Sequence, residues 1–483
     1  MAHLLESIYR YCPAWIQNLG ISLGGVRYRN ERLGGQFRQE VAAFQERDNW
    51  PAERMETYVT VQLREQLLRA FTDVPYYREA WRAAAITPSA LESVTPHTLS
   101  MLPIVTKREL RLDPQRFVSE RVRAREKLLT FLTSGSTGPP VQVICTAAAR
   151  RRFYASREVR SFGWAGVSTR MPRATIAGRM VVPRANSRGP FHRYNYTERQ
   201  LYFSTYHISP ANVRDYVDVL NRYRPPLFTG YAFSFFLLAT MMLQEGVLLG
   251  YAPKALVLSA EKLTPVMKDV IAQAFRARAF EEYSAVENCM LATECQHGSL
   301  HVSPDHGIIE IVDEGGLPVA PGREGRIVCT GLLNDAQPLI RYEIGDVGTW
   351  SDSTCPCGRD HLPVLKEVVG RLGDAVVAPD GRRMVRFGGV FAGLPHVLEG
   401  QVIQVELAKY RVKVVAIEGF GASDVESIRS RFHERLGPVE VQVERVSELE
   451  RNGRGKLRAV ISRVSAPEET QPYAVSGYRC KGQ

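Results

Sequence analysis

The 483-residue sequence lacks the long apolar runs that mark secreted and membrane-spanning proteins. Glu6 interrupts the apolar start of the chain, which leaves no hydrophobic segment of the length a signal peptide needs. The most hydrophobic stretch, residues 228–243, contains Thr229, Ser234 and Thr240 and falls short of the roughly 20 residues that span a membrane. We therefore expect a buried helix in this stretch and no transmembrane segment.

Cysteine is also scarce, and its eight residues do not follow the regular spacing of a disulfide framework. This favours a reduced protein in the cytoplasm. The net charge is +11, but lysine and arginine are scattered, with no basic stripe interleaved with aromatic residues. Nucleic-acid binding is therefore disfavoured, and the charge indicates at most a general attraction for polyanions such as ATP or CoA.

The pattern of apolar residues predicts an α/β fold with a large N-terminal domain and a small α+β C-terminal domain. Residues 1–125 have helical periodicity, and residues 126–373 alternate between β-like and helical segments. Residues 374–465 combine short strands with one helix, and residues 466–483 have the composition of a disordered tail. The first thirty residues have enough apolar side chains for a membrane surface, but their weak basic face favours packing on the main body.

A run of hydroxyl residues and glycines lies between two short apolar runs at residues 128–132 and 141–144. Such a run lets backbone N–H groups close around phosphate oxygens. A flexible linker is the alternative, but the flanking β-like runs favour a phosphate-binding loop of strand–loop–strand type. It has neither the Gly-Lys-Ser/Thr of a Walker loop nor a dinucleotide-binding G-x-G-x-x-G. The loop consists of Thr133, Ser134, Gly135, Ser136, Thr137 and Gly138.

This loop resembles the signature loop of the adenylate-forming superfamily, the acyl-CoA synthetases and ligases. There it grips the ATP phosphates while a carboxylate attacks the α-phosphorus. The family often has Pro-Lys after the loop, whereas here Val141 follows Pro140. Members similar to phenylacetate–CoA ligase commonly lack that lysine too, so the departure indicates a subfamily. The resemblance implies a large adenylation domain with mixed sheets and a small, mobile C-terminal domain.

Residues 283–287, Tyr-Ser-Ala-Val-Glu, resemble the superfamily's Tyr-Gly-x-Thr-Glu motif. The resemblance implies that Tyr283 stacks on adenine and that Glu287 holds magnesium, which favours carboxylate and phosphate oxygens. The family's Gly and Thr are replaced by Ser284 and Val286, so the finer contacts differ. Upstream, a segment resembles the one that lines the adenine pocket in phenylacetate–CoA ligases: Ser259, Ala260 and Glu261.

Three further segments follow in the family's order. Residues 341–346 resemble its Tyr-Arg-Thr-Gly-Asp segment, in which Asp346 would accept hydrogen bonds from the ribose hydroxyls. Residues 370–374 resemble the hinge, where Arg371 would approach the nucleotide and Asp374 would be the pivot of the small domain. Lys456 has the place of the catalytic lysine, which would neutralise charge on the α-phosphate during adenylation.

The resemblance extends to the capsule-biosynthesis-type branch of phenylacetate–CoA ligase-like proteins, through residues 206–210, residues 178–179 and the helical N-terminal region. For the acyl pocket the sequence offers His207, on a loop before an apolar helix, together with Tyr231 and Val286. Their aromatic and apolar surroundings favour an aryl or other hydrophobic acid over a polar one.

Cys355 and Cys357 form a tight thiol pair in a turn and are too close in sequence to bridge each other without strain. Metal ligation is the functional interpretation, and free thiols in a surface loop are the alternative. Cys295 and His301 would complete a tetrahedral zinc site with a structural role, and His297 is a competing ligand.

Together the motifs predict an ATP- and magnesium-dependent ligase that joins a small carboxylic acid to CoA through an acyl-adenylate, with release of pyrophosphate. The same first step would serve an amine, hydroxyl or carrier-protein acceptor in natural-product or polysaccharide biosynthesis. A non-catalytic nucleotide-binding relative is a second alternative. The four residues Glu287, Asp346, Arg371 and Lys456 argue against it, because a retired site has no need of all four. The oligomeric state stays open, with a homodimer as one option.

Overall fold

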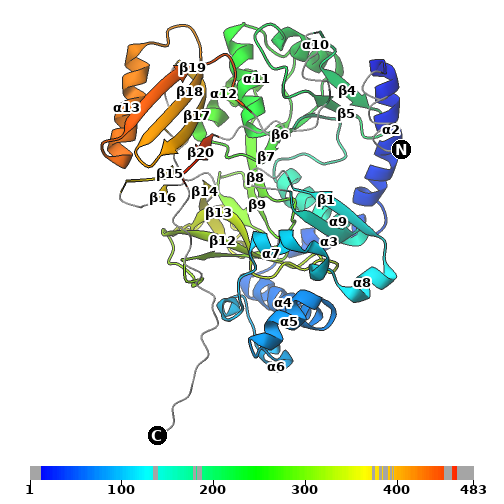
Figure 1. Cartoon of the computed structure of the whole chain (residues 1–483). Coiled ribbons are helices and arrows are strands. Elements are labelled where there is room, and N and C mark those ends of the chain that lie inside the picture. Colours follow the sequence, from blue (N-terminus) through cyan, green and yellow to red (C-terminus); the bar gives the residue numbers. More distant parts are fainter. Residues whose placement is uncertain are drawn as a thin grey trace. The chain divides into compact units, whose positions relative to one another are not determined.

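The computed structural model describes residues 12–133, 140–177, 181, 188–371, 376–379, 383–384, 390–391, 394, 396–450 and 459–464. The chain divides into two compact units, of which the first extends to Gly370 and the second begins at Arg371 (Figure 1). Each unit is described by itself. No helix in these ranges is both long and apolar enough to cross a membrane.

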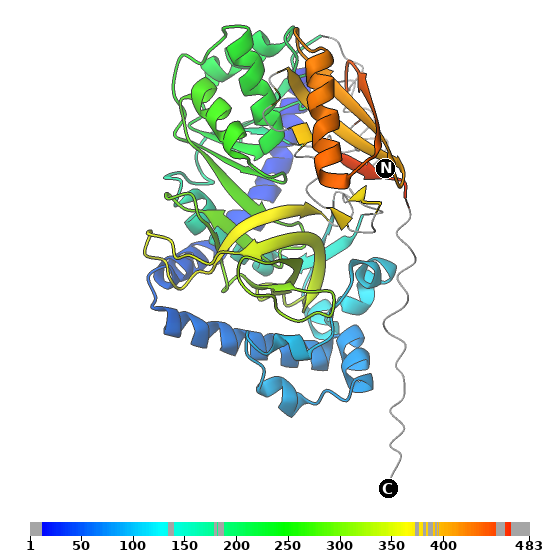
Figure 2. The ribbon, with the colours of Figure 1, turned by 90° about the vertical axis from the view of Figure 1, so that its left-hand side faces the viewer.

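Helices dominate the N-terminal part of the first unit. The longest, α4 (Ala52–Asp73), buries Met55, Val59, Leu63 and Leu67, which recur every four residues and form one face. This face packs in a common core against apolar side chains from residues 308–365, and Figure 2 shows α4 in blue alongside the yellow-green strands of that region. The neighbouring helices are α3 (Phe37–Arg47), α5 (Pro75–Ala83), α6 (Pro88–Glu92), α7 (Lys107–Leu112) and α8 (Glu120–Arg125).

Helix α2 (Ala14–Leu33) packs with its polar side inward. Gln17, Ser22 and Gly25 are buried, while Trp15, Leu19, Leu23 and Val26 are exposed. Polar contacts hold the helix to β4 (His192–Asn195): Asn18 Oδ1 accepts the N–H of Tyr194, and Ser22 Oγ accepts that of Tyr196. The expected packing on the main body is therefore present, but hydrogen bonds and not apolar contacts hold the two elements together.

A mixed sheet of twelve strands runs through the first unit in the order β11-β12-β13-β14-β10-β9-β8-β7-β6-β3-β5-β4. Five neighbouring strands, β5, β3, β6, β7 and β8, are parallel, and antiparallel strands flank them on both sides. The strands not yet bounded are β3 (Arg173–Ile176), β5 (Gln200–Phe203), β6 (Leu227–Tyr231), β7 (Ala255–Ser259), β8 (Ala279–Ser284), β9 (Leu291–Glu294), β10 (Leu300–Val302), β11 (Gly307–Val312), β12 (Glu324–Gly331), β13 (Tyr342–Trp350) and β14 (Val364–Arg371).

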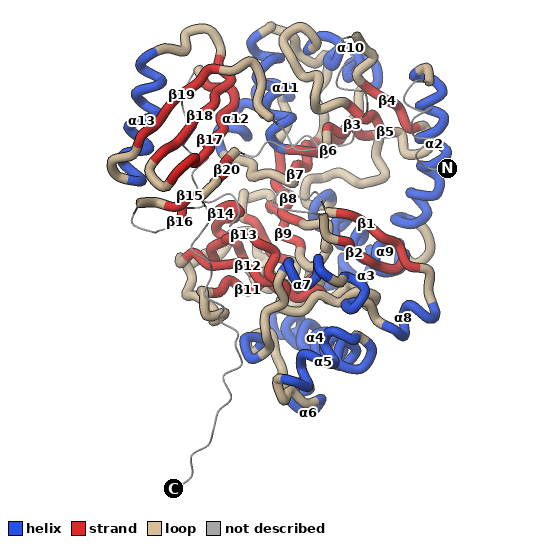
Figure 3. The backbone as a smooth tube through the Cα atoms, viewed as in Figure 1, coloured by secondary structure: helices blue, strands red, loops and turns tan. Residues whose placement is uncertain are grey.

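Helices α10 (Val213–Tyr223), α11 (Ala232–Gln244) and α12 (Pro265–Phe275) cover one face of the parallel strands (Figure 3). The hydrophobic stretch 228–243 supplies most of α11, so the expected buried helix is confirmed for its larger part. Its first residues instead complete β6, which runs to Tyr231 and includes Gly230 at a φ of +141°. Helix α9 (Ala147–Arg157) follows the strand pair β1 (Leu128–Leu132) and β2 (Gln142–Thr146).

The second unit contains a four-stranded sheet in the order β19-β18-β17-β20. Helix α13 (Ala422–Leu436) buries Ile428 and Phe432 in a core that it shares with Val412 and Val414 of the sheet. The α/β class with a small α+β unit at the C-terminal end, predicted from the sequence, is confirmed. The elements of this unit are β15 (Val376–Val377), β16 (Arg383–Met384), β17 (Val397–Glu406), β18 (Lys409–Ala416), β19 (Glu440–Arg445) and β20 (Val460–Ser462).

Candidate active site

The predicted phosphate loop begins and ends on two paired strands. Strands β1 and β2 are antiparallel, and Leu132 lies opposite Gln142 at the last pair before the loop. Thr133, which is buried, closes the neck: its N–H donates to the Val141 carbonyl at 3.0 Å, and its Oγ1 accepts the Val141 N–H at 2.9 Å. The strand–loop–strand arrangement is thus present, while the other predicted loop residues, 134–138, lie outside the described residues.

Two predicted nucleotide-binding residues from distant segments are in direct contact. Tyr283, at the end of β8, donates its hydroxyl to Asp346 Oδ2 on β13 at 2.8 Å. Burial and the nearby carboxylate of Asp346 raise the pKa of Tyr283 well above its ordinary value, so the hydroxyl stays protonated and remains a donor. The contact fixes the orientation of the ring and of the carboxylate together.

The predicted magnesium ligand, Glu287, is 4% exposed and is held from two sides. Its Oε1 accepts the hydroxyl of Tyr342 at 3.2 Å and lies 3.2 Å from Nζ of Lys107. Lys107 is the first residue of α7, which a capping box between Thr106 and Glu109 fixes at its N-terminus. Sequence reasoning missed this lysine, because 180 residues separate it from Glu287 and no spacing rule connects them.

A buried histidine shapes the turn that follows Glu287. Asn288 has a φ of +51°, and its carbonyl accepts a hydrogen bond from His306 Nε2 at 3.3 Å. The other ring nitrogen of His306 lies 2.8 Å from the hydroxyl of Ser156. Burial lowers the pKa of His306 to about 4, so the ring is neutral near pH 7 and its protonated nitrogen is the one that the Asn288 carbonyl requires. This positioning residue also went unnoticed in the sequence.

The predicted adenine-pocket segment lies at the carboxyl end of β7. Ser259 is paired with Tyr231 on one side and with Glu282 on the other, so three parallel strands end at the same edge. Ala260 then turns sharply, with a φ of +72°, and Glu261 Oε2 accepts the N–H of Phe233 at 3.1 Å. In open α/β sheets, ligands bind at such an edge.

The structure describes little of the other predicted catalytic and hinge residues. Arg371 is the last residue of β14, and only its backbone is described. Asp374 and Lys456 lie outside the described residues, as do residues 178 and 179. Their roles therefore stay predictions.

The three predicted acyl-pocket residues have different surroundings. His207 is buried, with Nδ1 2.7 Å from Ser204 Oγ and its ring stacked on Phe191 at 4.8 Å, so its ring face is used in packing. Tyr231 is partly buried where β6 meets α11, and Val286 is 39% exposed. Of the three, Tyr231 and Val286 leave side-chain surface for a ligand.

Four potential metal ligands converge as expected: Cys295, His301, Cys355 and Cys357, whose donor atoms all lie within 4.8 Å of one another. The Sγ atoms of Cys295 and Cys355 are 3.6 Å apart, and Cys357 Sγ is 3.3 Å from His301 Nε2. His301 Nδ1 lies 3.0 Å from the Leu362 carbonyl, a hydrogen bond that directs Nε2 at the thiols. The competing His297 is exposed and outside the cluster.

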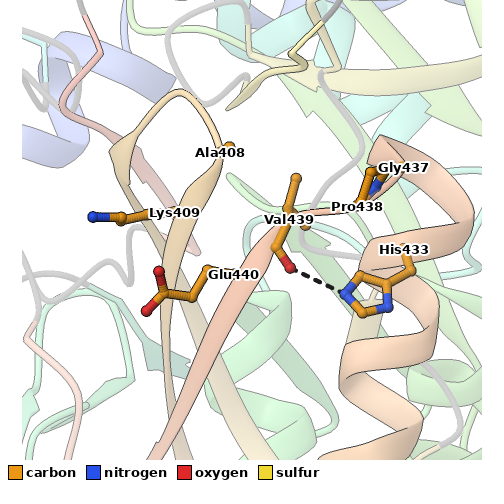
Figure 4. A pocket seen from close by; sticks show the side chains of 7 residues that line it. All are labelled: Ala408, Lys409, His433, Gly437, Pro438, Val439 and Glu440. Carbon is orange, nitrogen blue, oxygen red and sulfur yellow. Dashed lines mark hydrogen bonds between the residues drawn. The ribbon is translucent and has the colours of Figure 1, made fainter.

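A surface depression of about 620 Å³ on the second unit contains none of the predicted site residues (Figure 4). His433 Nε2 hydrogen-bonds there to the Val439 carbonyl at 3.0 Å, which joins the end of α13 to the start of β19. The depression therefore results from the packing of α13 against β19, and we assign it no binding role. Its lining comprises Ala408, Lys409, His433, Gly437, Pro438, Val439 and Glu440.

Comparison of the sequence with known proteins finds relatives of this chain. No protein-family model matches the chain. The protein CapK of Staphylococcus aureus is 25% identical over 378 residues, which cover 77% of this chain and 79% of CapK. A phenylacetate–coenzyme A ligase of Thermus thermophilus is 25% identical over 346 residues, covering 69% of this chain and 74% of that enzyme. The chain is a relative of CapK and of the phenylacetate–coenzyme A ligases.

The fold of this CapK relative agrees with that of a solved ligase. The structure of 2-hydroxyisobutyryl-CoA ligase in the postadenylation state has a TM-score of 0.64 at 22% sequence identity, and the match covers 85% of this chain and 90% of the ligase. The chain therefore has the fold of this ligase. The sequence matches to CapK and to a phenylacetate–coenzyme A ligase agree with the resemblance drawn from the motifs.

Proposed function

We propose that the chain is an ATP-dependent carboxylic acid ligase that forms an acyl-adenylate, releases pyrophosphate and passes the acyl group to CoA. The observation that carries the proposal is the contact of Tyr283 with Asp346 on β13, a strand whose Tyr342 also hydrogen-bonds to the buried, cation-paired Glu287. Three residues with separate predicted roles toward one nucleotide are thereby brought together from segments far apart in the sequence. The phenylacetate–coenzyme A ligases among the relatives support CoA as the acceptor.

Each residue has a role that its surroundings support. The ring of Tyr283 would stack on adenine, and Asp346, an acceptor already held by one hydroxyl, would accept hydrogen bonds from the ribose. Glu287 fits magnesium, because its buried carboxylate is stabilised by a cation, Lys107, in the absence of a metal. Magnesium would neutralise phosphate charge. Lys456 would stabilise the charge on the α-phosphate and carboxylate oxygens.

Exchange of labelled pyrophosphate into ATP, measured across a panel of carboxylic acids, tests the adenylation step directly. We propose an aryl or other hydrophobic acid, so exchange should be strongest with acids of that kind. Asp346→Asn and Glu287→Gln should each reduce exchange by at least about tenfold, since each removes a charged partner. Asp352→Asn, an exposed change on the same unit, is the matched control. Binding of ATP without exchange for any acid would refute the enzyme and favour a non-catalytic nucleotide-binding protein.

The two half-reactions can be tested separately. Lys456→Ala should abolish formation of the adenylate but spare transfer from supplied acyl-adenylate to CoA. An equal loss of both half-reactions would contradict a role for this lysine in adenylation alone. Mass spectrometry of the product with and without CoA would identify the acceptor. The described cysteines form no disulfide, which, with the cytoplasmic supply of ATP and CoA, supports a cytoplasmic location.

We further propose that the cysteine–histidine cluster holds a structural zinc ion. Tetrahedral zinc with Zn–S bonds of about 2.3 Å places two sulfur ligands about 3.8 Å apart, and the Sγ atoms of Cys295 and Cys355 are 3.6 Å apart. Metal analysis of the purified protein should find one zinc per chain. Cys355→Ser should lower both the zinc content and the thermal stability, whereas Cys12→Ser should change neither. Clearly substoichiometric metal together with unaltered stability of Cys355→Ser would rule the site out.

A further inference from the structure

A cavity of about 870 Å³ lies between helix α2 and the sheet, in the first unit. The side chains of strands β3–β6 alternate between the two faces of the sheet. Ile176 and Phe228 pack into the core beneath α10–α12, whereas Thr175 and Thr229 line the cavity. The cavity is therefore on the face of the sheet opposite to those helices, and its volume falls in the range of small-molecule sites.

Helix α2 gives the cavity a polar wall. The side of the helix that lines the cavity contributes Gln17, Tyr28 and Arg32. Two glycines between them, Gly24 and Gly25, have no side chain that would fill the cavity. A Cβ at Gly24 would meet no atom within 4 Å. This arrangement explains why the polar side of α2 faces the protein: it lines a cavity and does not fill a core.

The lining carries an excess of positive charge. Four arginines, Arg32, Arg157, Arg173 and Arg193, line the cavity, and Glu198 is the one carboxylate among the described lining residues. Glu198 pairs with both Arg32 and Arg173, the latter at 3.2 Å. A second carboxylate behind the lining, Glu282, pairs with Arg157 at 2.9 Å. Among the described residues, the lining thus holds four guanidinium groups and one carboxylate, and a second carboxylate pairs with Arg157 from behind it.

The pKa of Tyr154, another lining residue, is lowered by two of these arginines. Burial opposes the ionisation of its hydroxyl, yet Arg32, Arg157 and Arg150 lower its pKa to about 8. The guanidinium of Arg32 also lies over its ring, 5.2 Å from the centroid. An anionic group placed near this hydroxyl would be attracted by the same cations.

The remaining lining offers many uncharged hydrogen-bonding groups. Thr175 and Thr229 are 2.8 Å apart through their hydroxyls, and Gln200 donates to Thr175 at 2.7 Å. Asn195 and Tyr202 add an amide and a phenol. We propose that this cavity binds a small anionic, hydroxyl-rich molecule of the sugar-phosphate or sugar-acid class, with its anionic group at the arginines and its hydroxyls at the threonine and amide groups. The proposal does not depend on the proposed adenylation.

The cavity connects to the candidate active site through a short chain of polar contacts. Arg157 pairs with Glu282 Oε2, and Glu282 Oε1 accepts the hydroxyl of Ser284 at 2.9 Å. Ser284 follows Tyr283 directly on β8. A ligand that attracts Arg157 would therefore act on a residue next to the predicted adenine contact.

Isothermal titration calorimetry of the full chain tests the site with four probes: glucose 1-phosphate, glucuronate, glucose and inorganic phosphate. Glucose 1-phosphate or glucuronate should bind at least about tenfold more tightly than glucose and inorganic phosphate, because only these two combine both features. Their relative affinity decides between a phosphate and a carboxylate. Saturating AMP should leave the binding in place. Binding that AMP abolishes, or four equally weak probes, would overturn the proposal.

Two variants locate the binding. Gly24→Leu should fill the cavity and weaken binding of the preferred probe by at least about tenfold, and Arg157→Gln should do the same by removing charge. Arg27→Gln removes an exposed arginine from the same helix and should leave affinity unchanged. Circular dichroism and urea unfolding would establish that each variant folds. Folded variants that all bind like the unmodified chain would show that the probe occupies another surface, and the proposal would fail.

Discussion

Lys107 should compete with magnesium for Glu287, so replacing it should strengthen magnesium binding. Its Nζ lies 3.2 Å from Glu287 Oε1, which also accepts the hydroxyl of Tyr342. A magnesium ion bound at this carboxylate would have to displace the ammonium group. Lys107→Met removes that competitor and leaves Glu287 with its full negative charge.

The geometry sets the size of the effect. Two unit charges at this distance attract each other by about 5 kcal/mol at an effective dielectric constant of about 20. The side chain of Lys107 is 27% exposed, however, and that of Glu287 is 4% exposed, so water screens part of the attraction. Pairs with one exposed partner retain about 1–1.5 kcal/mol. We therefore expect a magnesium concentration for half-saturation about tenfold lower in Lys107→Met.

The assay is a magnesium titration of ATP binding by calorimetry, which needs no knowledge of the acid. Arg108→Met is the matched control, since Arg108 is the exposed neighbour on α7 and removes the same charge without the contact. It should leave the half-saturating concentration within about twofold. An unchanged value for Lys107→Met would refute the competition. A higher value would show that the lysine assists nucleotide binding, which also contradicts the reasoning.

The remaining predictions concern stability, each measured by urea unfolding. Asp305→Asn should cost about 3–5 kcal/mol, because it leaves Arg160 and Arg47 buried without their shared carboxylate. Burial opposes the ionisation of Asp305, but these two arginines lower its pKa to about 2. Its contribution of about 2 kcal/mol to the free energy of unfolding is therefore present above pH 4 and is lost as the pH falls toward 2. An Asp305→Asn variant with the same acid sensitivity as the unmodified chain would contradict this. Gly230→Ala should cost at least about 2 kcal/mol, since its φ is +141° and the new Cβ would lie 1.9 Å from the Ile176 carbonyl oxygen. Gly24→Ala, in the interior of α2, should instead stabilise the chain by about 0.5–1 kcal/mol; equal effects of the two changes would refute the assigned strain.

The site residues that belong to short motifs could be predicted from the sequence. The four-residue interval between Tyr283 and Glu287 and the Gly-Asp pair at Asp346 predicted a nucleotide site only together with the loop at residues 133–138, through their joint resemblance to the adenylate-forming superfamily. The contact between Tyr283 and Asp346 agrees with that prediction: Tyr283 lies near the end of β8, and Asp346 lies within β13.

The parts that the sequence did not contain depend on long-range pairing. Lys107 meets Glu287 only because α7 packs against β13, and His306 reaches Asn288 only through the core. Helix α2 was misleading for another reason. Its apolar residues suggested an inward face, but the cavity beneath the helix favours polar side chains there. Similarly, the choice of His301 over His297 follows from the pairing of β10 with β9 and β14.

The cysteine–histidine cluster also bears on the order in which the chain assembles. Cys295 and Cys355 are separated by 60 positions, and strands β10, β11, β12 and β13 lie between them. A ribosome must therefore release all four strands before the fourth donor, Cys357, is available, so a metal ion would join the nascent chain late. Once bound, it would close that segment into a loop, and a cross-link over such a length removes about 4 kcal/mol of conformational freedom from the unfolded chain. The metal would then join the turn after β9 to the loop before β14, and it could do so only after both segments have been made.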